Sequence, residues 1–204
     1  MNNLRKIIVS TTLITSVLLL TSCAQSTSVQ RVDTNVEIAL TDKWNDKDSQ
    51  LVAKAMIDDM LSFPWIDKHL QKERKNPAVI IQKIRNKSHE HIPMDTFLND
   101  LKRAMLRTGR VDFVANGDVR SDVREERADQ ELNASLASQN EMGEEQGADY
   151  ALTGSINSIV DQVEGKRVTF YQVDLSLIDM TTNREVWNGQ KKIKKYLERA
   201  SVGY

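Results

Sequence analysis

The residue with the most distinctive chemistry in this chain is Cys23, its only cysteine. The segment before it starts with the basic pair Arg5-Lys6, continues as an apolar run over 7–20, and ends in Leu20-Thr21-Ser22 directly before the thiol. This order is typical of a bacterial secretory signal that is cleaved in front of a cysteine. A thiol is needed there because its sulfur takes a diacylglycerol group as a thioether. The sequence therefore predicts that residues 1–22 are a lipoprotein signal peptide and that Cys23 becomes an N-palmitoyl, S-diacylglycerol cysteine.

A retained membrane helix is the alternative for this segment. The apolar run over 7–20 is shorter than the ~20 residues that a helix needs to cross a bilayer, which favours the cleaved signal. Ala24 rather than an aspartate follows the cysteine, and in Gram-negative lipoproteins this is typical of export to the outer membrane. We therefore expect a lipid-anchored outer-membrane protein that faces the periplasm.

Net charge and cysteine content argue against a nucleic-acid partner and against stabilisation by disulfides. The formal net charge of the whole chain is −1, so the sequence predicts no strong positive field of the kind that holds nucleic acid or anionic lipid. With Cys23 acylated, no intrachain disulfide can form, and the domain must depend on a packed core. We expect neither a nucleic-acid partner nor a small-molecule substrate.

The histidines give only a weak metal signal. His89 and His91 flank Glu90, and residues two apart share one face of a strand, so they could form a pair of metal ligands. No third ligand is defined, and the sequence favours an exposed His89 and a partly buried His91 without a metal. The aspartates of the chain also lack the ordered spacing of a calcium loop.

No catalytic or nucleotide-binding pattern is present either. The serines lack the Gly-x-Ser-x-Gly setting of a strained nucleophile, and Gly143, Gly147 and Gly154 do not follow a phosphate-binding order. The sequence therefore predicts no catalytic, cofactor-binding or metal-binding residues, and a protein that is not an enzyme.

The rest of the chain reads as a short tether and one domain. Residues 23–33 are small and polar, which predicts a tether that reaches ~35 Å at most. Residues 34–204 have a length that suits one globular domain. The expected strands and helices alternate along it, with strands at 36–40, 78–84, 111–114, 148–159, 167–178 and 184–196 and helices at 46–61, 94–108 and 120–145. The segment 66–76 is expected to be a helical turn and a loop.

This order, β-α-β-α-β-α-β-β-β, predicts an α/β (α+β) fold with a mixed sheet, three to four helices and a final three-stranded meander. The apolar residues repeat with the periods of helices and strands. The expected buried positions are Leu51, Val52, Ala55, Met56 and Met60; Phe97, Leu98, Leu101, Ala104 and Met105; Ala128, Leu132 and Leu136; and Tyr171, Val173, Leu175 and Leu177. Trp44 and Trp65 are expected in the core, and Trp187 either in the core or in an interface.

Several blocks, in order, resemble the LpoB family of outer-membrane lipoproteins that activate class A penicillin-binding proteins. They are Asp42-Lys43-Trp44-Asn45-Asp46, Pro64-Trp65-Ile66, Asn86-Lys87-Ser88-His89-Glu90-His91-Ile92, Thr108-Gly109-Arg110, Gly147-Ala148-Asp149-Tyr150 with Leu152-Thr153-Gly154, and Val186-Trp187. The block from Gly147 to Gly154 is shared more widely with TolB N-terminal-like domains. The resemblance covers most of the chain after Cys23.

The resemblance implies a TolB N-terminal-like domain and a noncatalytic role. Such a protein would bind a bifunctional class A penicillin-binding protein and stimulate peptidoglycan synthesis by favouring its active state. The tether departs from the family, because residues 23–33 are short and contain no proline. A structural or accessory subunit of an outer-membrane secretion assembly is the alternative, and it would form stable homo-oligomers.

Overall fold

The computed structural model describes residues 28–34, 36–140 and 143–199. The predicted signal peptide and Cys23 lie outside these residues. The chain divides into a first unit up to Val36 and a domain from Glu37 onward. Within the described part, no helix is long and apolar enough to cross a membrane.

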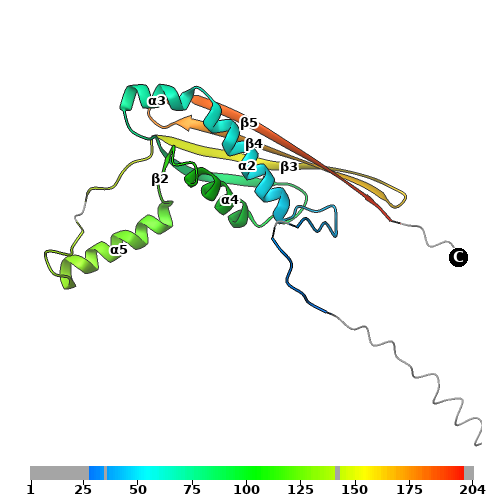
Figure 1. Cartoon of the computed structure of the whole chain (residues 1–204), viewed down its shortest axis with the longest axis horizontal. Helices are drawn as coiled ribbons and strands as arrows, with labels where there is room; N and C mark the ends of the chain where they lie inside the picture. Colours follow the sequence, from blue (N-terminus) through cyan, green and yellow to red (C-terminus); the bar gives the residue numbers. More distant parts are fainter. Residues whose placement is uncertain (1–27, 35, 141–142, 200–204) are drawn as a thin grey trace, which may run out of the picture. The chain divides into compact units, whose positions relative to one another are not determined.

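The domain is a five-stranded mixed sheet with four described helices (Figure 1). The helices are α2 (Asp46–Ser62), α3 (Trp65–Glu73), α4 (Met94–Leu106) and α5 (Gly117–Asn133), and the strands are β1 (Ala78–Lys87), β2 (Asp112–Phe113), β3 (Tyr150–Val163), β4 (Lys166–Asp179) and β5 (Glu185–Glu198). The strand order is β2-β1-β3-β4-β5. The pairs β2–β1 and β1–β3 are parallel, whereas β3–β4 and β4–β5 are antiparallel. The predicted α+β mixed sheet with a final meander is confirmed.

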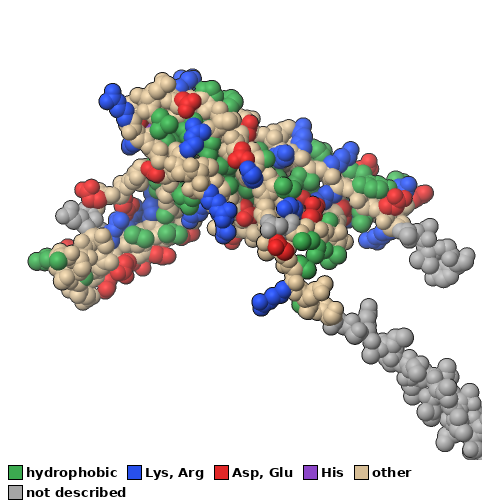
Figure 2. Space-filling view, viewed as in Figure 1, with side chains coloured by type: hydrophobic (Ala, Val, Ile, Leu, Met, Phe, Trp, Pro, Cys, Tyr) green, Lys and Arg blue, Asp and Glu red, His purple; other side chains and the backbone are tan. Residues whose placement is uncertain are grey.

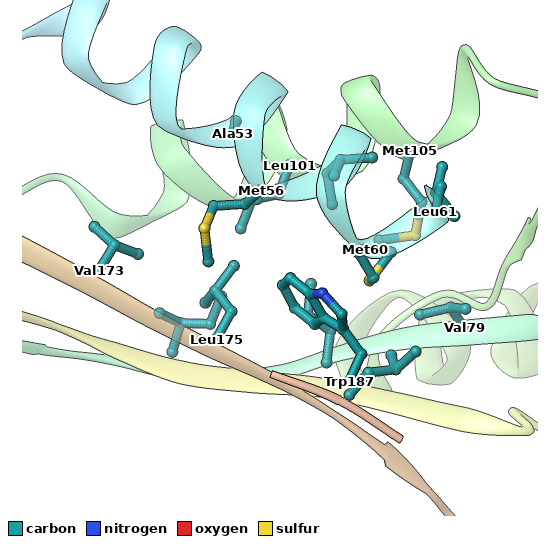
Figure 3. Close-up of a cluster of buried hydrophobic side chains, with 14 of the residues drawn as sticks. Ala53, Met56, Met60, Leu61, Val79, Leu101, Met105, Val173, Leu175 and Trp187 are labelled. Atoms are coloured by element: carbon teal, nitrogen blue, oxygen red, sulfur yellow. The ribbon is translucent and has the colours of Figure 1, made fainter. Parts of the chain in front are cut away.

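The core lies between the sheet and the helices α2 and α4. Side chains of α2 such as Met56 and Met60 point towards Leu175 and Trp187 of the sheet, with Leu101 of α4 beside them (Figure 3). All five are at most 2% exposed. The alternation of β4 explains its buried face, because every second residue of a strand points to the same side. The predicted burial of Tyr171, Val173, Leu175 and Leu177 is confirmed.

The start of α2 shows how the sequence sets an element boundary. Asn45 is the N-cap, and its side chain accepts a hydrogen bond from the backbone N–H of Asp48. The Asp48 carboxylate accepts in return from the backbone N–H of Asn45, which closes a capping box. Asn45 therefore sets the start of α2, and Asp48 completes the motif.

A three-stranded ribbon projects from the sheet beyond the helices. Strands β3, β4 and β5 have 14 residues each, whereas β1 has 10. The β3–β4 connection is a tight turn in which Glu164 and Gly165 have φ of 37° and 78°, as two-residue hairpins require. The hairpin and α3 lie at opposite ends of the sheet (Figure 1).

Several expectations about elements were wrong. Residues 36–40 do not form the expected strand and are mostly exposed. The segment after Pro64 is a regular helix, α3, rather than a turn and a loop. The expected apolar stripe of the third helix is not buried, since Leu132 and Leu136 are 84% and 91% exposed and α5 has no buried residue.

The buried stripe of α2 is also displaced from the expected one. Leu51 is 50% exposed, whereas Ala53, Ile57 and Leu61 are buried together with Val52. The helix has apolar residues on more than one side, so periodicity alone could not select the face that meets the sheet.

Candidate interaction surfaces

Trp44, Glu90 and Tyr171 meet at the N-terminal end of α2. The backbone N–H of Trp44 donates to Glu90 Oε1 over 2.8 Å, and the Tyr171 hydroxyl donates to the same oxygen. The indole of Trp44 packs edge-on against Tyr171 at 5.5 Å between ring centroids and donates from Nε1 to Ser49 Oγ over 2.7 Å. Trp44 is partly buried against the core, which agrees with its predicted place there. These contacts join three segments that are distant in the sequence.

The loop after β1 is built to hold Glu90. Asn86 donates from Nδ2 to the carbonyl of Glu90 over 2.9 Å, and its Oδ1 accepts from the backbone N–H of Ser88 over 2.9 Å. The Ser88 hydroxyl also donates to the Glu90 carbonyl over 3.0 Å. The Asn-x-Ser-x-Glu spacing is therefore that of a loop that turns one carboxylate inward.

Asp42 fixes the beginning of the domain to β4. Its carboxylate accepts from the Thr169 hydroxyl and forms an ion pair with Arg167, whose Nε lies 2.9 Å away. Burial acts to raise the pKa of Asp42, but the hydrogen bond from Thr169 and the charge of Arg167 outweigh it and hold the pKa below its usual value. Burial and the Glu90 carboxylate raise the pKa of Tyr171. Asp42 is thus held as a carboxylate, and Tyr171 as a neutral phenol.

The two candidate metal ligands are not brought together. His89 is exposed, as predicted, and its Nδ1 lies 2.6 Å from Ser158 Oγ. His91 is also exposed, so its expected partial burial was wrong. The described residues contain no group of three side chains placed to hold a metal ion.

A pocket lies at the opposite end of the sheet, beside α3. It has a volume of about 440 Å³ and lies between α3 and the turn that joins β4 to β5. Phe63, Lys68, His69, Tyr150 and Arg184 are among its lining residues. Trp65 forms one wall, since its ring packs edge-on against Tyr150 at 4.8 Å and its Nε1 donates to the carbonyl of Met60 over 2.7 Å.

The inner wall of this pocket is a polar pair that the sequence did not reveal. His69 is 6% exposed, and its Nδ1 lies 3.1 Å from the Tyr150 hydroxyl. His69 Nε2 has no hydrogen-bond partner and lies 3.9 Å from Asp149 Oδ2, which accepts from the backbone N–H of Ala78 over 2.8 Å. His69 was missed because it lies in a charged segment whose helix was not expected.

The rim of the pocket carries both signs of charge and exposed apolar surface. Lys68 and Arg184 line it together with Glu73 and Asp179. Burial acts to raise the pKa of Asp179, but the backbone N–H groups of Thr182 and Thr181 lower it below its usual value. Phe63 and Met180, both 46% exposed, flank this end of the domain. A concave surface with exposed apolar groups and a mixed polar rim suits a protein partner.

A family model described as peptidoglycan-synthase activator LpoB matches residues 48–193. The chain belongs to the LpoB family. This match spans α2 to β5 and includes the Glu90 loop, the α3 pocket and the strand that begins at Tyr150. The predicted family is confirmed, and it is a family of synthase activators rather than of enzymes.

Solved structures similar to this LpoB-family chain share little sequence with it. The C-terminal domain of LpoB from Escherichia coli is 15% identical, with a TM-score of 0.46 and coverage of 72% of this chain and 99% of that one. The NMR structure of E. coli LpoB is 15% identical, with a TM-score of 0.41 and coverage of 88% and 81%. Lipoprotein GNA1162 from Neisseria meningitidis is 14% identical, with a TM-score of 0.40 and coverage of 62% and 88%. A comparison with curated proteins found no match.

Most of the residues that carry the resemblance serve the fold. Trp44 and Glu90 hold α2 to the loop after β1, and Asp149 caps the start of β1. Gly154 is needed because a Cβ there would lie 2.1 Å from the carbonyl oxygen of Asp174. Trp187 is 2% exposed, which decides its role in favour of the core. The family blocks therefore specify mainly an internal framework, and some of their residues, such as Trp65 and Tyr150, also line the α3 pocket.

Proposed function

We propose that this chain is a lipid-anchored, noncatalytic activator of a bifunctional class A penicillin-binding protein. Cys23 carries the lipid, the outer membrane holds it, and the domain faces the periplasm. There it promotes peptidoglycan synthesis and so contributes to cell-wall biogenesis and cell shape. The observation that supports this proposal is the match of the synthase-activator family to residues 48–193, which is nearly the whole folded domain.

The α3 pocket is the docking surface that the geometry favours. It combines a hollow of about 440 Å³, the exposed aromatic ring of Phe63 and charges of both signs. Exposed aromatic residues at the edge of a well-formed hollow are common anchors of protein interfaces. The pocket also lies at the far end of β4 from the contacts of Asp42.

The mechanism is a shift of the synthase between two conformations. An activator that binds the active conformation more tightly than the inactive one raises the active fraction by the ratio of the two affinities. The pocket end need supply no catalytic group for this. It must only meet a surface that differs between the two synthase states.

The proposal is tested by binding and activity measured in the same samples. The mature chain is titrated into the organism's bifunctional penicillin-binding proteins, and polymerisation of the lipid-linked precursor is followed. We expect saturable binding and faster polymerisation with one of them. Phe63→Ala and Lys68→Glu should each weaken binding, whereas Val119→Ala, at a side chain with a similar exposed fraction of 48% on α5, should not.

Two results would count against the proposal in different ways. Loss of stimulation with the Val119 variant but not with the pocket variants would place the docking surface elsewhere on the domain. Absence of binding to every such synthase, together with a stable homo-oligomer, would favour the secretion-assembly alternative.

A further inference from the structure

The outer end of the ribbon carries exposed apolar side chains on its open face. Residues paired across strands share a face and successive residues alternate. The register aligns Ile159 with Phe170 and Val168 with Tyr196 on the face opposite to buried Tyr171. Ile159 and Tyr196 are 67% and 58% exposed. Val163, at the β3–β4 turn, is 65% exposed. We call Ile159, Val163, Val168, Phe170 and Tyr196 the tip cluster.

The same end of the ribbon carries more basic than acidic side chains, although Lys166, Arg167 and Lys195 form ion pairs with carboxylates. Residues 159–168 and 191–199 contain seven basic and three acidic side chains, although the whole chain has a net charge of −1. Lys192 and Lys194 are exposed and share the open face with the tip cluster, since they pair with Gln172 and Phe170. In the space-filling view, hydrophobic, basic and some acidic side chains lie next to each other along the projecting ribbon (Figure 2). Apolar and aromatic groups beside lysines match the boundary between lipid tails and anionic headgroups.

The chain enters the domain at this same end. The Tyr171 hydroxyl donates to the carbonyl of Asp42 over 3.2 Å, and Lys195 Nζ donates to the carbonyl of Lys43 over 2.7 Å. The β3–β4 turn is only about five strand residues beyond these contacts, or roughly 17 Å at ~3.4 Å per residue. From Cys23 to Asp42 the chain can extend to ~65 Å at most. A lipid anchor at Cys23 would therefore leave the tip cluster within reach of the membrane.

We propose that the tip cluster and its lysines form a second membrane contact that docks on the anionic phospholipid surface holding the anchor. This rests on the proposed lipid attachment at Cys23. The lipid anchor at Cys23 and a weak second contact reinforce each other, because the tether holds the second contact at a high local concentration. The contact would orient the domain with the ribbon towards the lipid and the α3 pocket towards the periplasm.

A second copy of the chain is a less suitable occupant of this surface. Two copies meeting through their open faces would bring Lys192 and Lys194 of one near the same lysines of the other, and like charges at close range repel. The exposed edge of β5 carries the same lysines, and lysine on an edge strand disfavours pairing with another strand.

The test uses residues 24–204, which keep every described helix and strand of the domain. An N-terminal hexahistidine segment tethers the chain to vesicles of phosphatidylcholine with a nickel-chelating lipid, with or without phosphatidylglycerol. This tether replaces the acyl group, so the result does not depend on whether Cys23 is acylated. A single cysteine, Val163→Cys in the tip cluster or Thr181→Cys at the opposite end, carries an environment-sensitive fluorophore.

We expect the probe at position 163, but not the probe at position 181, to shift its emission to the blue on vesicles with phosphatidylglycerol. Brominated lipid should quench the probe at 163 selectively. Lys192→Glu with Lys194→Glu should abolish the shift, and high salt should weaken it. Equal behaviour of the two probes, or no shift of either one, would overturn the proposal. No synthase is present, so this outcome is independent of the activator test.

Discussion

Glu90→Ala tests whether the family blocks form a framework or a contact surface. The substitution removes the oxygen that accepts from both the Trp44 backbone N–H and the Tyr171 hydroxyl. Tyr171 is fully buried, so its hydroxyl would lose its charged partner and keep only the longer bond of 3.2 Å to the carbonyl of Asp42. The backbone N–H of Trp44 would lose its acceptor, whereas the indole would keep its hydrogen bond to Ser49.

The magnitude follows from these two bonds. A hydrogen bond to a charged group contributes ~1.5–3 kcal/mol, and the half-buried position of Glu90 argues for the lower end of this range. Loss of both bonds should therefore lower the free energy of unfolding by about 3 kcal/mol. For a domain of this size that corresponds to a fall in Tm of roughly 6–12 °C. Urea unfolding followed by tryptophan fluorescence would measure it. Glu125→Ala, at an exposed position of α5, is the control and should change stability by less than ~0.5 kcal/mol.

Stimulation of the synthase by Glu90→Ala distinguishes a framework role from a contact role. Well below its Tm, Glu90→Ala should still bind the synthase and stimulate it to the same maximum, because the contact surface lies elsewhere. If Glu90→Ala left the unfolding curve unchanged but abolished stimulation, Glu90 would belong to the contact surface and our assignment of the loop to the framework would be wrong.

Three further substitutions test the core, the sheet and the buried phenol. Leu101→Ala, at a fully buried side chain, should cost ~2–5 kcal/mol in urea unfolding, whereas Leu132→Ala at an exposed position should cost almost nothing. Gly154→Ala should lower Tm strongly because its Cβ would meet the backbone of β4. Gly147→Ala, with open space around it, should not. Equal effects would contradict the close approach of β3 and β4 at Gly154. The pKa of Tyr171 is raised in the folded domain, so Tyr171 stabilises the domain below its unfolded pKa of about 10, and this contribution is lost as the pH rises above that value. Tyr171→Phe should therefore remove ~1.4 kcal/mol per pH unit from the fall in unfolding free energy at alkaline pH. An unchanged slope would mean that Tyr171 ionises freely.

The sequence predicted the parts of the fold that repeat with a regular period. The alternation around Tyr171 and Leu175 identified the buried face of β4, and the spacing of Phe97, Leu101 and Met105 identified that of α4. Both elements have one clear apolar face, so their periodicity and their packing agree. The mixed sheet and the meander followed from these assignments.

Other features could not be read from local patterns because distant contacts decide them. The expected strand at residues 36–40 does not form although its residues alternate, since none of the described strands pairs with it. The α3 pocket combines His69 with Tyr150, which are 81 residues apart. Glu90 and Trp44 are 46 residues apart, and neither type of residue signals a hydrogen bond to the other.

Interior and surface residues differ in what the family assignment says about them. Glu90, Asp149 and Gly154 are constrained by backbone groups that any chain with this sheet must satisfy, so their pattern identifies the fold and the family. The pocket rim at Lys68 and the tip cluster are open to solvent and meet only a partner. These surfaces can change without unfolding the domain, so the proposed choice of synthase and orientation at the membrane would depend on residues such as Lys68 that the family blocks do not include. A domain docked by its ribbon end, as proposed above, would present the α3 pocket at the end of the sheet that faces away from the membrane.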